Sequence, residues 1–155
     1  MLRDMGLPGV GDLDGRRLEI VATGLPVHRG LPLGVDATLV SPLHATGAPW
    51  PRAAEMDGVA IARAERDKRK TYPELLDSCA MRLVTVAAEV GGRMSADSRD
   101  LLRQLATARA RSAPLLVRAA ARHSWFRRWT GMLIVAVQDT LAIYMDPHAS
   151  HTHQP

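Results

Sequence analysis

Residues 16–21 (RRLEIV) and 33–40 (LGVDATLV) decide the fold, because each is a short apolar run that carries one acidic residue. Two glycines and two prolines lie between the runs, and these residue types favour a turn or loop. We therefore expect two neighbouring strands that bring Glu19 and Asp36 side by side. Two carboxylates at the edge of a sheet are suitable ligands for a hard divalent cation such as Mg²⁺.

The segment that follows predicts a helix and a third strand. Apolar residues recur at helical spacing over about residues 53–72, and Pro73 favours the end of that helix. Residues 81–88 (MRLVTVAA) are rich in β-branched side chains and predict a strand in the centre of the sheet. The sequence thus indicates an α/β fold, in which helices flank a small sheet.

The C-terminal third of the chain, residues 95–145, is expected to be helical. Ser95 is a good N-cap for a first helix, because its hydroxyl can accept a hydrogen bond from a free amide of the first turn. Pro114 suits the first turn of a second helix. Gly131 is a point at which this second helix could kink or divide.

Length and composition indicate one domain of 155 residues, 46% of them hydrophobic. We divide the chain into an irregular lead-in (1–15), a folded domain (16–145) and a disordered tail (146–155). The single cysteine, Cys79, excludes an internal disulfide framework and a cysteine-based zinc site. The longest apolar run, residues 131–145, is too short and too polar to span a membrane, so no membrane partner is expected.

Positive charge is concentrated between residues 93 and 128, which hold nine arginines and two aspartates. Arginine can bind phosphate in a bidentate manner, so this segment could be a nucleic-acid-binding surface. A solvated helix face is the alternative interpretation. The candidate contacts to nucleic acid are Arg93, Arg118, Arg122, Arg127 and Arg128.

Four segments, in this order, carry a resemblance to a known family. They are residues 16–19 (RRLE), 34–43 (GVDATLVSPL), 68–75 (KRKTYPEL) and 89–93 (EVGGR). Together they resemble the C-terminal segment of retroelement reverse-transcriptase polyproteins. That segment is similar to the restriction-enzyme-like endonuclease domain of non-LTR retrotransposons, a member of the PD-(D/E)xK nuclease superfamily. The resemblance covers roughly residues 16–140.

The resemblance implies a metal-dependent DNA endonuclease that cleaves phosphodiester bonds. It places Glu19 at the first acid of the family and Asp36 at the second, as ligands of Mg²⁺ or Mn²⁺. Thr38 stands where the family usually has a lysine. In the retroelement branch a lysine on the following helix takes over this role, which points to Lys68 as a catalytic residue and to Lys70 as the second choice.

The resemblance also implies DNA as substrate, the polymerase region of a parent polyprotein as partner, and an intracellular location, the nucleus in a eukaryotic host. The chain would then be a fragment of a longer reading frame, with activity retained or lost. A non-catalytic nucleic-acid-binding module using the arginine-rich helices is the other function that the sequence supports. In that case Glu19 and Asp36 would be ordinary residues of a half-buried hairpin, and residues 68–70 a solvated helix end.

Overall fold

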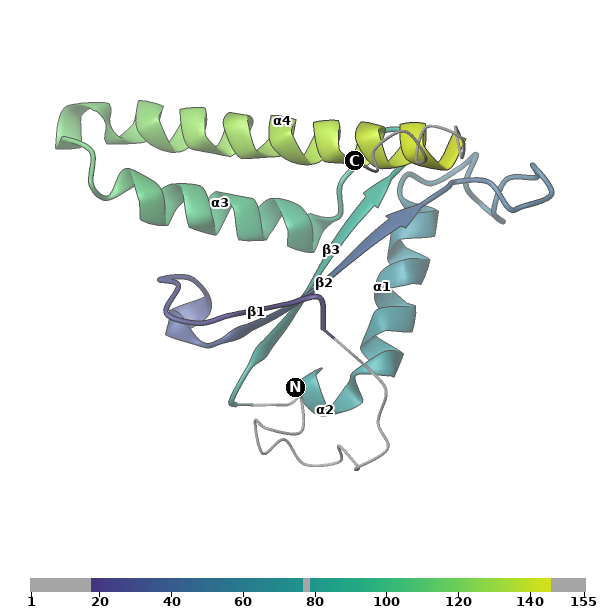
Figure 1. Ribbon diagram of the computed structural model, residues 1–155, viewed down its shortest axis with the longest axis horizontal. Helices are drawn as coiled ribbons and strands as arrows, with labels where there is room; N and C mark the ends of the chain where they lie inside the picture. The colour runs from purple at the N-terminus through teal and green to yellow at the C-terminus, as the bar shows by residue number, and fades with distance from the viewer. Residues whose placement is uncertain (1–17, 77–78, 146–155) are drawn as a thin grey trace, which may run out of the picture.

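The computed structural model describes residues 18–76 and 79–145, which form a mixed α/β fold (Figure 1). Over these residues, the strands are β1 (Ile20–Ala22), β2 (Leu33–Val40) and β3 (Arg82–Glu89). The α-helices are α1 (Val59–Thr71), α2 (Pro73–Leu76), α3 (Ala96–Ala110) and α4 (Arg118–Met145), and two 3-10 helices are η2 (His28–Gly30) and η3 (Leu115–Val117). The expected lead-in and tail lie outside the described residues.

The three strands form one sheet in the order β1-β2-β3. Strand β1 pairs antiparallel with β2, with Ile20 opposite Val35, so the two acid-bearing runs are neighbours as predicted. Strand β3 runs parallel to β2, with Asp36 opposite Thr85. Parallel neighbours need a crossover connection, and α1 and α2 supply it.

The prediction that residues 81–88 form the central strand is wrong, because β2 occupies the centre and β3 lies at an edge. The start of α3 closes this edge. The Ser95 amide donates to the Ala87 carbonyl at 2.9 Å, and the Ala87 amide donates to Ser98 Oγ at 2.9 Å. These bonds satisfy the backbone groups of Ala87 on the outer edge of β3. Strand β3 is apolar because helices cover it, not because it is central.

The predicted helix over residues 53–72 is confirmed in its second part only, since α1 begins at Val59. Residues 51–57 form turns, and Arg52 has a φ angle of 67°. Gly58 precedes the helix with a φ angle of 75°, a left-handed conformation that interrupts a right-handed helix. The end of the helix agrees with the prediction, since α1 stops at Thr71, two residues before Pro73.

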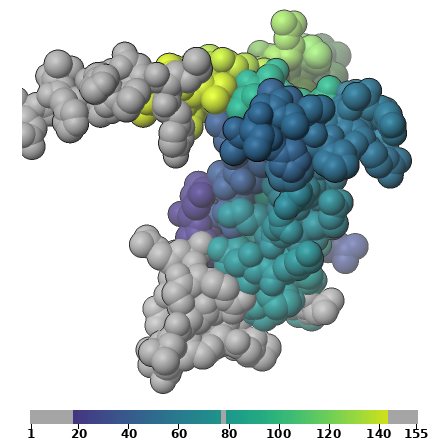
Figure 2. Space-filling model, turned by 90° about the vertical axis from the view of Figure 1, so that its right-hand side faces the viewer, coloured from purple at the N-terminus to yellow at the C-terminus, as the bar shows by residue number. Residues whose placement is uncertain are grey.

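Buried side chains form two clusters, one on each face of the sheet. The first lies against α1 and α2 and contains Leu18, Tyr72, Leu75, Met81 and Leu83. The second lies against α3 and contains Val27, Leu33, Val84 and Leu101. Figure 1 shows α1 along one side of the strands and α3 on the other. Figure 2 shows the face on which α1 and the loop between β2 and α1 are exposed.

Helices α3 and α4 form an antiparallel hairpin that projects from the sheet (Figure 1). Ser95 is the N-cap of α3, as predicted, and its Oγ accepts from the Ser98 amide at 3.0 Å. Pro114 precedes η3, which leads directly into α4, so it lies one short turn earlier than expected. Helix α4 continues through Gly131 without a break, because its exposed neighbours force no bend there.

Candidate functional site

A buried ion pair links the central strand to α1. Asp36, on β2, is only 2% exposed, and its Oδ1 accepts a hydrogen bond from Lys68 Nζ at 2.9 Å. The second carboxylate oxygen, Oδ2, is buried and has no hydrogen-bond partner. An unsatisfied buried oxygen of a charged group is unfavourable, so this atom marks a point where a cation or a donor would be bound favourably.

The position of Lys68 follows from the spacing of α1. Ala60 is buried and Ala64 half-buried, and Lys68 continues the same row four residues later. The small alanines allow α1 to approach the sheet, and the lysine stem lies along the apolar surface. The Lys68 side chain remains 31% exposed, so the lysine side of the ion pair is in contact with solvent while the carboxylate side is buried.

Glu19 lies immediately before β1 and is exposed. Its Oε2 accepts a hydrogen bond from the Ala37 amide at 3.1 Å. Strand β1 begins only at Ile20, so the Glu19 carboxylate satisfies a backbone donor of β2 that a longer β1 would have bound. Glu19 is therefore held beside the residue that follows Asp36, and it also lines a trough that α4 borders.

The two acids differ in their surroundings. Asp36 faces α1 and is bonded to Lys68, whereas Glu19 is at the rim of the sheet and bonded to backbone. In the part of the chain that the structure describes, no three or more histidine, cysteine, aspartate or glutamate side chains form a group that could hold a metal ion.

The second-choice lysine does not join this site. Lys70 is highly exposed and lies 3.8 Å from Asp67 on its own helix. A step of two residues turns an α-helix by about 200°, which carries Lys70 away from the face that Lys68 presents. Lys70 therefore lies on the surface, and Lys68 is the lysine that contacts Asp36.

One polar residue near the site has no role in the sequence-based prediction. Thr85 is buried and lies opposite Asp36 in the register of β2 and β3. It lines a hollow of about 330 Å³ together with Arg69 and Asp97, which are 3.5 Å apart. The signal in the sequence is a single polar residue in the apolar run of residues 83–88. Its alignment with Asp36 becomes visible only with the strand register.

The five arginines predicted to bind nucleic acid are in different environments. Arg93 is paired with Asp57 at 2.8 Å and with Glu89 at 3.7 Å, so acids within the domain already neutralise it. Arg118 donates to the carbonyl groups of Arg111 and Ala113, both at 3.3 Å, and so fixes the turn between α3 and α4.

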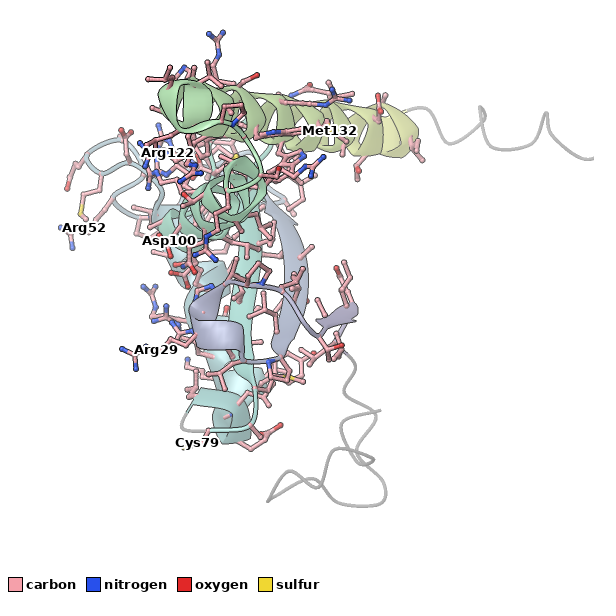
Figure 3. The ribbon with its side chains drawn as sticks, turned by 90° about the vertical axis from the view of Figure 1, so that its left-hand side faces the viewer. Arg29, Arg52, Cys79, Asp100, Arg122 and Met132 are labelled. Atoms are coloured by element: carbon pink, nitrogen blue, oxygen red, sulfur yellow. The ribbon has the colours of Figure 1, made fainter. Side chains whose placement is uncertain are left out.

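The other three are exposed on α4. Arg128 lies over the Trp125 ring at 5.7 Å, whereas the Arg122 and Arg127 side chains form no ion pair or hydrogen bond with the described residues. Figure 3 shows Arg122 and Asp100 on one flank of the hairpin and Met132 on the other. These arginines are free to meet an external anion.

Comparisons with protein-family models, with curated proteins and with solved structures find no match to this chain. Among the described residues, no helix combines the length and the apolar character needed to cross a lipid bilayer.

Proposed function

We propose that this chain is a metal-dependent DNA endonuclease domain with a PD-(D/E)xK-like core. One observation carries the proposal: Lys68 Nζ bonds to Asp36 Oδ1 at 2.9 Å, while Asp36 Oδ2 is buried and unsatisfied. The resemblance named these two residues, which are 32 positions apart in the chain, as acid and lysine of one site. A contact between them is what such a site requires.

The donor set is compatible with Mg²⁺ or Mn²⁺. Asp36 would hold the ion through Oδ2, which has no other partner, and Glu19 would have to turn from the trough beside α4 to supply a second carboxylate. When bound, such an ion polarises phosphoryl oxygens and lowers the pKa of a water molecule. The proposal depends on Glu19 exchanging or sharing its bond to the Ala37 amide with the cation.

Lys68 would stabilise negative charge on the phosphate. Its ammonium group is held by Asp36 but remains partly exposed, so it can contact a substrate without leaving the carboxylate. A cation held in a fixed position contributes more to a charged transition state than a mobile one does, because no reorganisation is needed. The hollow lined by Thr85 and Arg69 is next to this part of the sheet, since Thr85 is opposite Asp36 in the strand register.

Nicking of supercoiled plasmid DNA with Mg²⁺ or Mn²⁺ tests the proposal. We expect cleavage by the wild-type chain, loss of cleavage in Asp36→Asn, and a fall of at least about 100-fold in Lys68→Met, within the range typical of one electrostatic group. Arg66→Gln is the matched control, because Arg66 is an exposed cation on the same helix. Circular dichroism verifies that each variant is folded.

The proposal fails if the folded wild-type chain nicks DNA with neither metal. It also fails if Asp36→Asn retains wild-type activity, since the carboxylate would then hold no essential ion. In the first case, DNA binding without cleavage would leave the non-catalytic binding module as the function.

A further inference from the structure

The α3–α4 hairpin has an excess of positive charge that the fold does not neutralise. We use the name arginine hairpin for residues 96–130, which comprise α3, η3 and the first half of α4. Among the described residues, none of its arginines forms an ion pair, although all are exposed. They are Arg99, Arg103, Arg109, Arg111, Arg118, Arg122, Arg127 and Arg128.

The acids of the hairpin are engaged with other groups. Asp97 lies 3.5 Å from Arg69 of α1, and Asp100 accepts a hydrogen bond from Gln104 at 2.6 Å. Neither acid is paired with an arginine of the hairpin. Arg93, beside the sheet, contrasts with this arrangement, since it is bound to two carboxylates. The hairpin therefore presents uncompensated charge to solvent.

Aromatic rings hold some of these cations in place. The Arg103 guanidinium lies 5.6 Å from the centre of the Phe126 ring, and Arg109 and Arg128 lie 5.2 and 5.7 Å from that of Trp125. Such cation–π contacts order a side chain that would otherwise be mobile. They also cover the ring faces on which an unpaired base would stack, so the arrangement favours phosphate over bases as ligand.

We propose that the arginine hairpin binds the phosphate backbone of duplex DNA without sequence preference. This inference names the surface that would hold the DNA substrate of the proposed function, but binding does not depend on cleavage. Arginine recognises phosphate oxygens through its planar fork of donors. Contacts to phosphate position a protein on the duplex and carry no sequence information.

An anionic lipid surface is a different partner, and the distribution of charge argues against it. The turn between α3 and α4 exposes apolar side chains, above all Leu116, which is 98% exposed. Within the arginine hairpin a membrane would meet this tip, since the other strongly exposed apolar side chains, such as Met132 and Val135, lie farther along α4. The arginines, however, begin at Arg99 in the first turn of α3, and the 15 residues of α3 extend over about 22 Å. An extended polyanion matches this length better than a surface touched only at the tip.

The test compares wild-type chain with the triple variant Arg99→Gln, Arg122→Gln and Arg127→Gln. These three side chains are exposed and form no hydrogen bond or ion pair among the described residues, so their loss leaves the fold intact. Binding to two fluorescent duplexes of unrelated sequence is measured by anisotropy in EDTA, which prevents metal-dependent cleavage. Leu116→Ser is the matched control, because it changes an exposed hairpin residue without changing charge.

We expect the wild-type chain to bind both duplexes within about threefold of each other and to lose affinity steeply with salt. Each lost phosphate contact lowers the slope of log K against log salt by about 0.9, so the triple variant should have a slope smaller by about 2.7. Between 50 and 200 mM salt, the wild-type chain should therefore lose about 40-fold more affinity than the triple variant. Leu116→Ser should retain the wild-type slope.

An unchanged slope in the triple variant overturns the inference. So does binding to phosphatidylserine vesicles in place of DNA, with Leu116→Ser abolishing that binding, because lipid would then be the partner. The two proposals fail separately. If the wild-type chain binds DNA in a salt-dependent manner but does not nick it, only the proposed cleavage is rejected. If the triple variant still nicks DNA and binds it with unchanged affinity, only the proposed role of the hairpin is rejected.

Discussion

Removal of Lys68 should destabilise the fold more than neutralisation of its partner Asp36. In Lys68→Met the Asp36 carboxylate would remain buried with neither oxygen bonded to a side chain, since Oδ2 already has no partner. In Asp36→Asn the ammonium group would be left instead, but the Lys68 side chain is partly exposed and can bind water. Removal of the lysine thus leaves a buried charge without a partner, whereas neutralisation of the aspartate leaves a charge on a partly exposed side chain.

The expected magnitudes follow from the geometry. Two unit charges 2.9 Å apart interact by about 6 kcal/mol at an effective dielectric constant near 20, before either charge is desolvated. Breaking a buried pair costs about 3–5 kcal/mol, and the partial exposure of Lys68 places Lys68→Met at the lower end, about 3 kcal/mol. Asp36→Asn should cost about 1–2 kcal/mol, as expected for a lost hydrogen bond to a charged group.

Urea denaturation measures these differences as a shift of the midpoint at a constant slope. The double variant Asp36→Asn/Lys68→Met contains neither charge, so its loss of stability should be about 2 kcal/mol smaller than the sum of the two single losses. The reasoning is refuted if Lys68→Met costs no more than Asp36→Asn, or if the two losses add. Either result would mean that the carboxylate is not trapped in an apolar environment.

Two further substitutions test the edge and the core of the sheet. Ser98→Ala removes the hydroxyl that is hydrogen-bonded to the amide and the carbonyl of Ala87. It should lower the free energy of unfolding by about 1–3 kcal/mol. Ser112→Ala, on the exposed turn, is the control and should have little effect in the same assay. Gly34→Ala would place a Cβ atom 2.6 Å from Leu18 and 2.8 Å from Met81, both buried, so thermal unfolding should show a loss of about 1–3 kcal/mol. Gly91→Ala, where the new atom meets no neighbour, is the control, and an equal loss in both would contradict the packing argument.

Local patterns were sufficient for the elements whose residues decide their own conformation. Strands β2 and β3 and the end of α1 before Pro73 agree with the sequence-based prediction, as does Ser95 as the N-cap of α3, whereas β1 begins only at Ile20 and leaves Glu19 outside the strand. The start of α1 was not predictable from apolar spacing, because the turns before it depend on Arg52 and Gly58 adopting positive φ angles. Nothing in helical periodicity reports such a conformation.

The order of the strands depends on contacts between distant segments. Strand β3 has the composition of a central strand, but at Ala87 its outer edge is satisfied by Ser98 of α3 and by the N-cap residue Ser95. A run of β-branched residues indicates that a strand is covered, but it does not indicate whether helices or neighbouring strands cover it. The prediction failed at this point because a helix N-terminus can replace a neighbouring strand as hydrogen-bond partner.

The candidate site could likewise be predicted from the sequence only in part. The approach of Lys68 to the sheet follows from its place four residues after Ala64, and the resemblance named its partner. Thr85 could not be associated with Asp36, because only the register of β2 and β3 aligns them. The different surroundings of Glu19 and Asp36 could not be predicted either, since they depend on the residue at which β1 begins.

The distribution of charge connects the two proposed sites. Around the sheet, three cations are neutralised within the fold: Lys68 by Asp36, Arg69 by Asp97, and Arg93 by Asp57 and Glu89. On the arginine hairpin they are not. Exposed charges of one sign repel one another and lower the stability of the compact state, so their retention on one element needs a compensating benefit. An external polyanion, as we propose, would supply that benefit, because its binding would relieve the repulsion. The same polyanion would bring phosphodiester bonds to the domain that holds Asp36 and Lys68, which is why we consider the two surfaces parts of one function.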